Sequence, residues 1–187
     1  MMTQYIYAFD EGRISMKNLL GGKGANLSEM KRLGLPVPDG FTITTEACID
    51  YLKQNEQLPS EVKTLLNHHL TSFSERTGKS FCSDEDLLLV SVRSGAKISM
   101  PGMMDTILNL GLNDDNVKKL ADKTNDARFA YDCYRRLLQM FGEVVYGIPM
   151  LEFDTYFDDF KNKHNYKNDA DIPADGLLTI CERFKEI

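Results

Sequence analysis

A glycine-rich segment at residues 20–26 is the first place where residue types and spacing suggest chemistry. It reads Leu-Gly-Gly-Lys-Gly-Ala-Asn and stands between a strand-like segment and a helix-like one. Glycines let backbone N–H groups approach an anion closely, a helix start offers unpaired donors, and Lys23 adds a mobile ammonium group. Gly21, Gly22, Lys23 and Gly24 are therefore candidate phosphate ligands, although a plain tight turn with a solvated lysine is the commoner origin of such a stretch.

Two familiar phosphate-binding motifs do not fit this segment. A P-loop needs a glycine six positions before its lysine and a serine or threonine after it, whereas Lys17 and Gly24 stand there. The dinucleotide-binding fingerprint needs a third glycine or alanine at the position that Leu27 occupies. Any phosphate site here is consequently of another kind.

A second candidate is the arginine that ends a β-favouring run. Residues 90–97 read Val-Ser-Val-Arg-Ser-Gly-Ala-Lys, which places Arg93 at the carboxyl end of a predicted strand. A guanidinium offers a rigid fork of donors that matches phosphate oxygens, and ligands of α/β architectures gather at the carboxyl ends of strands. Arg93 is a candidate phosphate clamp; a salt bridge at the strand end is the structural alternative.

A turn rich in methionine follows closely, at residues 100–106. It reads Met-Pro-Gly-Met-Met-Asp-Thr. Gly102 would permit close backbone approach to a ligand, Thr106 offers a hydroxyl, and methionine side chains adapt to a planar base. Core packing around a turn explains the same composition equally simply.

Two other groups of polar residues predict no metal site. His68 and His69 are consecutive on a predicted helix, so their rings point in different directions and cannot share one metal ion. An acidic cluster on another predicted helix lacks the glycine and the alternating oxygen ligands of a calcium loop, and we interpret it as a solvated face. Its members are Glu152, Asp154, Asp158 and Asp159.

Composition limits the classes of partner. The chain has 187 residues, 42% hydrophobic and 27% charged, with a formal net charge of -6. This is the balance of a globular protein, and its field would not attract nucleic acid or an anionic membrane. No stretch approaches the roughly 20 apolar residues of a membrane span, and no signal peptide is evident. The four cysteines are far apart in the sequence, which predicts a reducing, cytoplasmic location.

Hydrophobic periodicity predicts a mixed, α+β chain in two parts. Residues 1–111 alternate strands with helices, and residues 112–187 form a mostly helical subdomain. One predicted helix begins at the glycines, and Thr45 is expected to cap the next. The predicted strands are residues 4–9, 40–44 and 87–92; the predicted helices are 25–33, 60–72, 126–141 and 177–187; residues 161–175 are predicted to be a polar surface loop.

Taken together, three segments resemble the start of members of the pyruvate, phosphate dikinase family. They are Asn-Leu-Leu-Gly-Gly-Lys-Gly-Ala-Asn-Leu at 18–27, Gly-Leu-Pro-Val-Pro-Asp-Gly-Phe-Thr-Ile-Thr-Thr at 34–45, and residues 92–109, which contain Val-Arg-Ser-Gly-Ala and Pro-Gly-Met-Met-Asp-Thr-Ile-Leu-Asn. Asp39 stands where the family commonly has proline, which we interpret as a change in a surface turn.

The resemblance implies an ATP-grasp-type nucleotide-binding lobe. By position, Lys23 would contact the inner phosphates of ATP and Arg93 the transferred end, which makes them the expected catalytic pair. Ser94, Gly102 and Thr106 would join the glycines in binding the nucleotide. The expected ligands are ATP and AMP.

The resemblance also implies parts that this sequence does not contain. Family members are several times longer, and they convert ATP, phosphate and pyruvate to AMP, pyrophosphate and phosphoenolpyruvate through a phosphohistidine on a central domain. We therefore expect a lobe truncated before its Mg²⁺-binding partner lobe, inactive alone, from a homodimeric parent. The alternatives are a fragment of a phosphoenolpyruvate synthase or another water dikinase, and a non-catalytic interaction module on the same scaffold.

Overall fold

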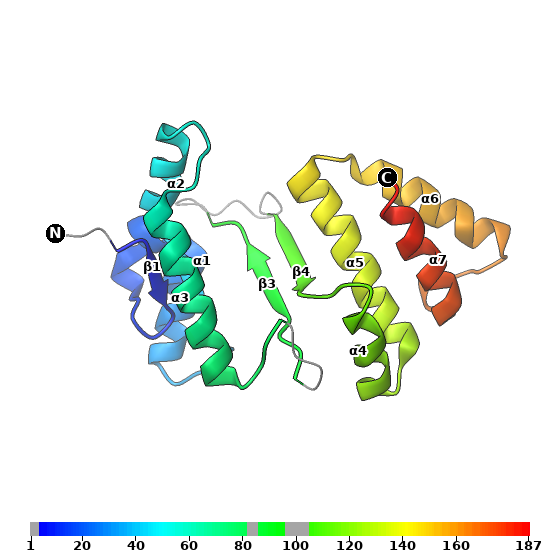
Figure 1. The fold of residues 1–187 in the computed structure, drawn as a ribbon, viewed down its shortest axis with the longest axis horizontal. Coiled ribbons are helices and arrows are strands. Elements are labelled where there is room, and N and C mark those ends of the chain that lie inside the picture. The colour runs from blue at the N-terminus through cyan, green and yellow to red at the C-terminus, as the bar shows by residue number, and fades with distance from the viewer. Residues whose placement is uncertain (1–3, 82–85, 96–104) are drawn as a thin grey trace. The chain divides into compact units, whose positions relative to one another are not determined.

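Two antiparallel strand pairs and seven α-helices make up the part of the chain that the computed structural model describes, which is residues 4–81, 86–95 and 105–187. Strand β1 (Ile6–Ala8) pairs with β2 (Phe41–Ile43), and β3 (Val90–Arg93) pairs with β4 (Thr106–Leu110). The helices follow one another in long stretches of the chain and do not alternate with parallel strands (Figure 1). The predicted α+β class is confirmed.

The first compact unit runs up to Lys79 and resumes at Ser94. Helix α1 (Lys17–Arg32) follows the short 3₁₀ turn η1 (Ile14–Met16), and α2 (Thr45–Lys53) and α3 (Ser60–Thr77) complete the unit. Its core joins the first strand to α2 and α3, because these elements turn their apolar faces toward one another. The buried members are Tyr5, Ile6, Ala47 and Val62.

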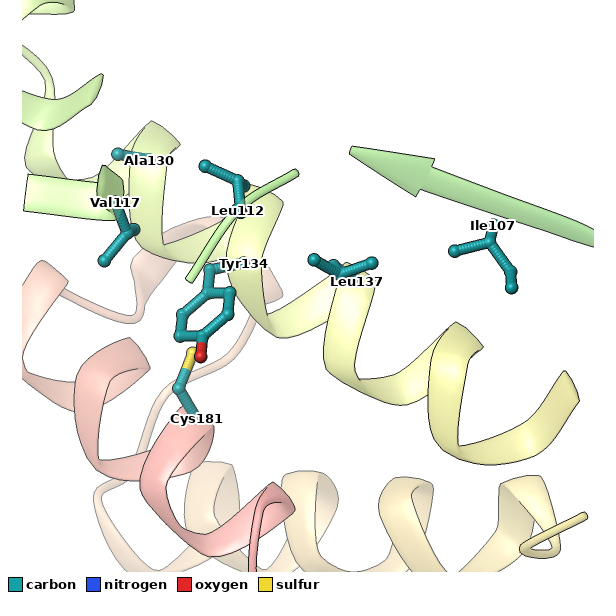
Figure 2. Close-up of a cluster of buried hydrophobic side chains, with 7 residues drawn as sticks. All are labelled: Ile107, Leu112, Val117, Ala130, Tyr134, Leu137 and Cys181. Atoms are coloured by element: carbon teal, nitrogen blue, oxygen red, sulfur yellow. The ribbon is translucent and has the colours of Figure 1, made fainter. Parts of the chain in front are cut away.

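The second compact unit begins at Ser80, stops after Arg93 and continues from Asp105 to Ile187. It contains β3, β4, α4 (Asn116–Thr124), α5 (Ala127–Tyr146), α6 (Met150–Lys163), η2 (Asp169–Asp171) and α7 (Ala174–Phe184). Helix α5 contacts β4, α4 and α7, so it is the centre of the unit. The cluster of buried side chains in Figure 2 is Ile107, Leu112, Val117, Ala130, Tyr134, Leu137 and Cys181.

A second apolar cluster lies between α6 and α7. Two of its rings, Phe153 and Phe184, meet edge to face with centroids 5.0 Å apart. Gly142 of α5 allows Phe153 to approach, because a Cβ at this position would lie 2.5 Å from the phenylalanine ring.

Contacts between residues group strands β3 and β4 with the helices of the second unit. The functional division predicted between residues 111 and 112 stays a prediction.

The helix predicted over 126–141 is confirmed and is longer than expected. It begins at Ala127, where the Asp126 carboxylate accepts the Phe129 N–H at 2.9 Å, and it ends at Tyr146 before Gly147 in the left-handed region. The polar loop predicted over 161–175 is wrong in part, because α6 continues to Lys163 and a 3₁₀ turn precedes α7. The Lys161 ammonium holds this region by donating to Asp169 at 2.7 Å.

The predicted helix cap at the start of α2 is shifted by one residue. The Thr44 hydroxyl accepts the Ala47 N–H at 3.3 Å, so Thr44 and not Thr45 is the capping residue. Thr44 is buried and its own N–H donates to the Tyr5 carbonyl at 2.9 Å. Thr45 therefore has its hydroxyl available for another contact.

Candidate functional site

The glycine-rich segment lies inside α1 and not in a loop before it. The helix starts at Lys17 and is interrupted at Gly21, which has φ 70° and ψ 169°; the helical conformation then resumes and continues to Arg32. The prediction of a helix that first begins at the glycines is therefore wrong for its start. The prediction is correct in that a helical stretch begins beside the glycines, because the break at Gly21 creates a second helix start within α1.

The three glycines of this segment have different structural roles. The conformation of Gly21 belongs to a backbone region that is essentially restricted to glycine. Gly24 packs against β2, since a Cβ there would lie 2.7 Å from Oγ1 and 2.8 Å from Cγ2 of Thr42. A Cβ at Gly22 would meet nothing within 4 Å. The space beside Gly22 is thus open to a ligand.

Lys23 lies two residues after the break at Gly21 and is half-buried. Backbone N–H groups in the first turn after a helix break lack carbonyl acceptors within the helix, and they carry the positive end of its dipole. The ammonium of Lys23 adds a full positive charge to this place. The arrangement is suited to an anion with several oxygen acceptors, such as a phosphate group.

The second group of predicted site residues lies at the end of the β3–β4 pair where β3 ends and β4 begins. Arg93 ends β3 and Thr106 begins β4, and the two are direct register partners. Arg93 is exposed and Thr106 is half-buried, and Ser94 follows on the exposed surface. Gly102 lies outside the described residues. A guanidinium and a hydroxyl are therefore presented together by two paired strands.

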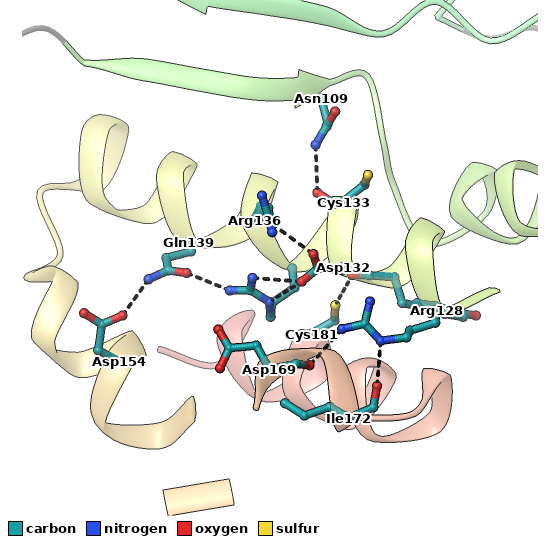
Figure 3. A network of polar contacts seen from close by, with 12 residues as sticks. Asn109, Arg128, Asp132, Cys133, Arg136, Gln139, Asp154, Asp169, Ile172 and Cys181 are labelled. Atoms are coloured by element: carbon teal, nitrogen blue, oxygen red, sulfur yellow. Dashed lines mark hydrogen bonds and ion pairs between the residues drawn. The ribbon is translucent and has the colours of Figure 1, made fainter. Parts of the chain in front are cut away.

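A β-bulge in β4 adjusts this pair of strands. Val92 is opposite Ile107 and Val90 is opposite Leu110, so β4 contains one more residue than β3 between the same two pairs. Asn109 occupies the bulge with φ 58°, and its Nδ2 donates to the Cys133 carbonyl of α5 at 3.2 Å (Figure 3). Sequence reasoning missed this anchor, for which an Asn before Leu-Gly was the only local signal.

The Lys23 group and the Arg93 group belong to different compact units. The Lys23 group consists of a helix break and a lysine in the first unit. The Arg93 group consists of a strand pair with an arginine and a threonine in the second unit. Each can supply positive charge and hydrogen-bond donors to an oxyanion.

The histidines and acidic residues have structural contacts. The His69 ring lies 5.5 Å from the Phe41 ring, and partial burial lowers the pKa of His69. Asp154 accepts from Gln139 of α5 at 2.9 Å (Figure 3). Within residues 4–81, 86–95 and 105–187, no group of three or more His, Cys, Asp or Glu side chains is placed to hold a metal ion. The described helices include none that is long and apolar enough to cross a membrane.

A surface hollow in the second unit has none of the predicted site residues in its lining. Its volume is about 530 Å³, and it lies between α6 and α7 in the second unit. Aromatic and histidine rings line it, among them Tyr156, Phe160, His164 and Tyr166. These rings pack on one another, with Phe160 and His164 4.3 Å apart, so we assign them to packing and not to chemistry.

Comparison with known proteins identifies the relatives of this chain. The family described as pyruvate phosphate dikinase, AMP/ATP-binding domain, matches residues 17–68, which include the broken helix and Lys23. A pyruvate, phosphate dikinase of Clostridium symbiosum is 50% identical over 186 residues, which is 100% of this chain and 21% of that protein. The chain is similar to pyruvate, phosphate dikinases along its whole length. The resemblance inferred from the motifs is confirmed.

Other dikinases give the same result. A pyruvate, phosphate dikinase of Giardia intestinalis is 46% identical over 100% of the chain and 22% of that protein. The chloroplastic pyruvate, phosphate dikinase 1 of Arabidopsis thaliana is 49% identical over 95% of the chain and 18% of that protein. The chain thus spans about a fifth of the length of the dikinases that it matches.

Proposed function

We propose that this chain supplies two phosphate-binding groups, one around Lys23 and one around Arg93, to the ATP site of a pyruvate, phosphate dikinase. The observation that carries the proposal is the glycine-restricted break at Gly21, which places Lys23 at a helix start. The segment that contains it matches a family described by AMP and ATP binding. Gly22 and Gly24 complete this group.

The two groups have distinct roles in the proposal. Lys23 and the backbone donors of Gly21, Gly22 and Gly24 bind the inner phosphates. Arg93 clamps the phosphoryl group that is transferred, and the Thr106 hydroxyl beside it donates to the same oxygens. Ser94, next to Arg93 in the chain, and Gly102 are further proposed ligands on the basis of the motif. Positive groups fixed where charge develops lower the barrier of phosphoryl transfer without having to reorganise.

The reaction as a whole belongs to a longer protein. In the proposal, ATP, phosphate and pyruvate become AMP, pyrophosphate and phosphoenolpyruvate through a phosphohistidine on another domain of a homodimer. The lobe is of the ATP-grasp type and works in the cytoplasm. The proposal places the Mg²⁺ ligands in other parts of that protein. The similar dikinases support this reading over a phosphoenolpyruvate synthase.

Calorimetric titration of the chain with ATP tests the proposal. We expect Lys23→Ala and Arg93→Ala each to weaken binding by about 10- to 100-fold, as for the loss of a charge-assisted hydrogen bond. Lys17→Ala, which removes an exposed lysine from the same helix, is the matched control and should leave the affinity unchanged. Equal affinities in all three variants and the wild type, or no ATP binding by the folded chain, would contradict the proposal.

A further inference from the structure

Two threonines on neighbouring elements contact α1 on either side of its break. The Thr45 hydroxyl, at the first residue of α2, donates to the Asn18 carbonyl at 2.8 Å. The side chain of Thr42, in the middle of β2, packs directly against Gly24. Asn18 precedes Gly21 and Gly24 follows it, so the two contacts enclose the segment that contains Lys23.

The contact to Asn18 replaces an interaction that the break disturbs. In a regular helix the carbonyl of residue 18 accepts the N–H of residue 22, four positions later. The non-helical conformation of Gly21 lies between these two residues and interrupts that ladder. Carbonyls at a helix end need partners from outside the helix, and the Thr45 hydroxyl is such a partner.

Both threonines are fixed by the strand and the helix that carry them. Thr42 is paired with Tyr7 in the β1–β2 ladder. Thr44, directly before Thr45, is tied to the Tyr5 carbonyl through its N–H and caps α2 through its hydroxyl. The contacts to α1 therefore come from a paired strand and a capped helix start of the first unit.

We propose that Thr45 is a positioning residue that acts, together with Thr42, by holding the break of α1 and thereby directing Lys23. This inference rests on the proposed function, because it is the nucleotide-binding role of Lys23 that gives the direction its consequence. Thr45 need not touch the nucleotide itself.

Two measurements on the full chain test the inference with Thr45→Val, which keeps the side-chain shape and removes the donor. The first is amide exchange of residues 19–26 by NMR, and the second is ATP affinity by calorimetry. We expect exchange in this segment to rise about 3- to 10-fold and affinity to fall by a similar factor, as for the loss of one hydrogen bond. Thr45→Ser, which keeps the hydroxyl, should restore both.

Thr64→Val is the matched control. The Thr64 hydroxyl also donates to a backbone carbonyl, that of Ser60 at 3.1 Å, but within the uninterrupted helix α3. This variant should leave the exchange of residues 19–26 and the ATP affinity unchanged. Should Thr45→Val not fold, Thr45→Ala, which also removes the donor, takes its place with the same two readouts and the same expected results.

The outcomes separate this inference from the proposed function. Unchanged exchange at residues 19–26 in Thr45→Val would overturn the inference. Faster exchange with unaltered ATP affinity would overturn it as well, because the break would then be loosened without consequence for Lys23. If the wild type bound no ATP, the proposed function would fail, and the exchange data alone would decide whether Thr45 holds the break.

Discussion

Arg93, the last residue of β3, and Thr106, the first residue of β4, stand directly opposite each other in the strand pair. They are 13 positions apart in the sequence. Arg93 is a candidate ligand because of its guanidinium at a strand end, and Thr106 because of its hydroxyl in the methionine-rich turn. Cross-strand neighbours have Cβ atoms about 4.5–5.5 Å apart, which is close enough for both side chains to bind oxygens of one phosphate group. The pairing thus makes one group out of two candidates.

The bulge at Asn109 should be essential to this strand pair. Asn109→Val forces a β-branched residue into φ 58° and removes the hydrogen bond to the Cys133 carbonyl, so we expect a loss of about 1–3 kcal/mol in the free energy of unfolding. Asn109→Gly removes only the hydrogen bond and should cost about 1 kcal/mol. Urea unfolding measures both, and equal losses in the two variants would show that the left-handed conformation carries no strain.

The glycines of α1 should separate by role when each is replaced. Gly21→Ala places a Cβ in a glycine-restricted conformation, and we expect it to lower the free energy of unfolding by about 1–3 kcal/mol. Gly22→Ala adds a methyl group in open space, so its stability should stay within about 1 kcal/mol of wild type. Its ATP affinity should nevertheless fall, because the methyl group would stand where we place the phosphates. Urea unfolding and calorimetry test the pair; the reverse order of stabilities would refute this assignment.

The contact between Gly24 and Thr42 predicts a recoverable clash. Gly24→Ala brings a Cβ to 2.7 Å from Thr42 Oγ1, and overpacking of this kind costs about 1–3 kcal/mol. Thr42→Ala removes the two nearest atoms that the new Cβ would meet and leaves the Leu20 Cβ, at 3.3 Å. The double variant should therefore be more stable than Gly24→Ala alone, and a double-mutant cycle in urea measures the coupling. Additive losses would mean that Thr42 does not limit the approach of α1 to β2.

Two neighbouring arginines of α5 should differ in their contribution to stability. The Arg135 side chain is 9% exposed, donates to Asp132 and to Gln139, and lies 4.6 Å from the centroid of the Phe157 ring. Arg136 also pairs with Asp132, but its side chain is 56% exposed. We expect Arg135→Ala to cost about 2–4 kcal/mol and Arg136→Ala less than about 1 kcal/mol. Thermal and urea unfolding check this order, and similar losses would contradict it.

Asp39 should make the stability of the first unit depend on pH. Its carboxylate pairs with Lys31 of α1 and, at 3.6 Å, with Arg76 of α3. The hydrogen bond from Lys31 holds the pKa of Asp39 below its ordinary value. A lowered folded-state pKa stabilises the fold above the unfolded pKa of about 3.9, and that contribution is lost as pH falls through the folded-state pKa.

Asp39→Asn tests this link between α1 and α3. We expect it to cost about 0.5–1 kcal/mol at pH 7, less at high salt, and nothing once the pH is below the folded-state pKa of Asp39. Urea unfolding between pH 7 and pH 3 at two salt concentrations provides the data. A loss that is the same at every pH and salt concentration would show that the ion pairs are not its cause.

The interpretation of Asp39 as a residue of a surface turn is therefore incomplete, because its carboxylate joins α1 to α3 through Lys31 and Arg76.

Local sequence was sufficient for the elements whose signals lie within one segment. The apolar spacing after Asp126 predicted α5, and the β-favouring residues around Tyr7 and Phe41 predicted β1 and β2, because side-chain periodicity and capping are properties of a few consecutive residues. The motifs around Lys23 and Arg93 likewise sufficed to predict the resemblance to dikinases that comparison confirmed.

Only the tertiary structure decided how those motifs are presented. The break within α1 is contacted by Thr42 and Thr45, which are distant in sequence from Gly21, and the strand pair that brings Arg93 opposite Thr106 contains a bulge anchored to α5. The last turn of α6 is joined to Asp169 in a later turn through Lys161. In each case a hydrogen bond or a close contact between distant segments selects one backbone conformation among several that local propensity permits, and such contacts leave no periodic signal in the sequence.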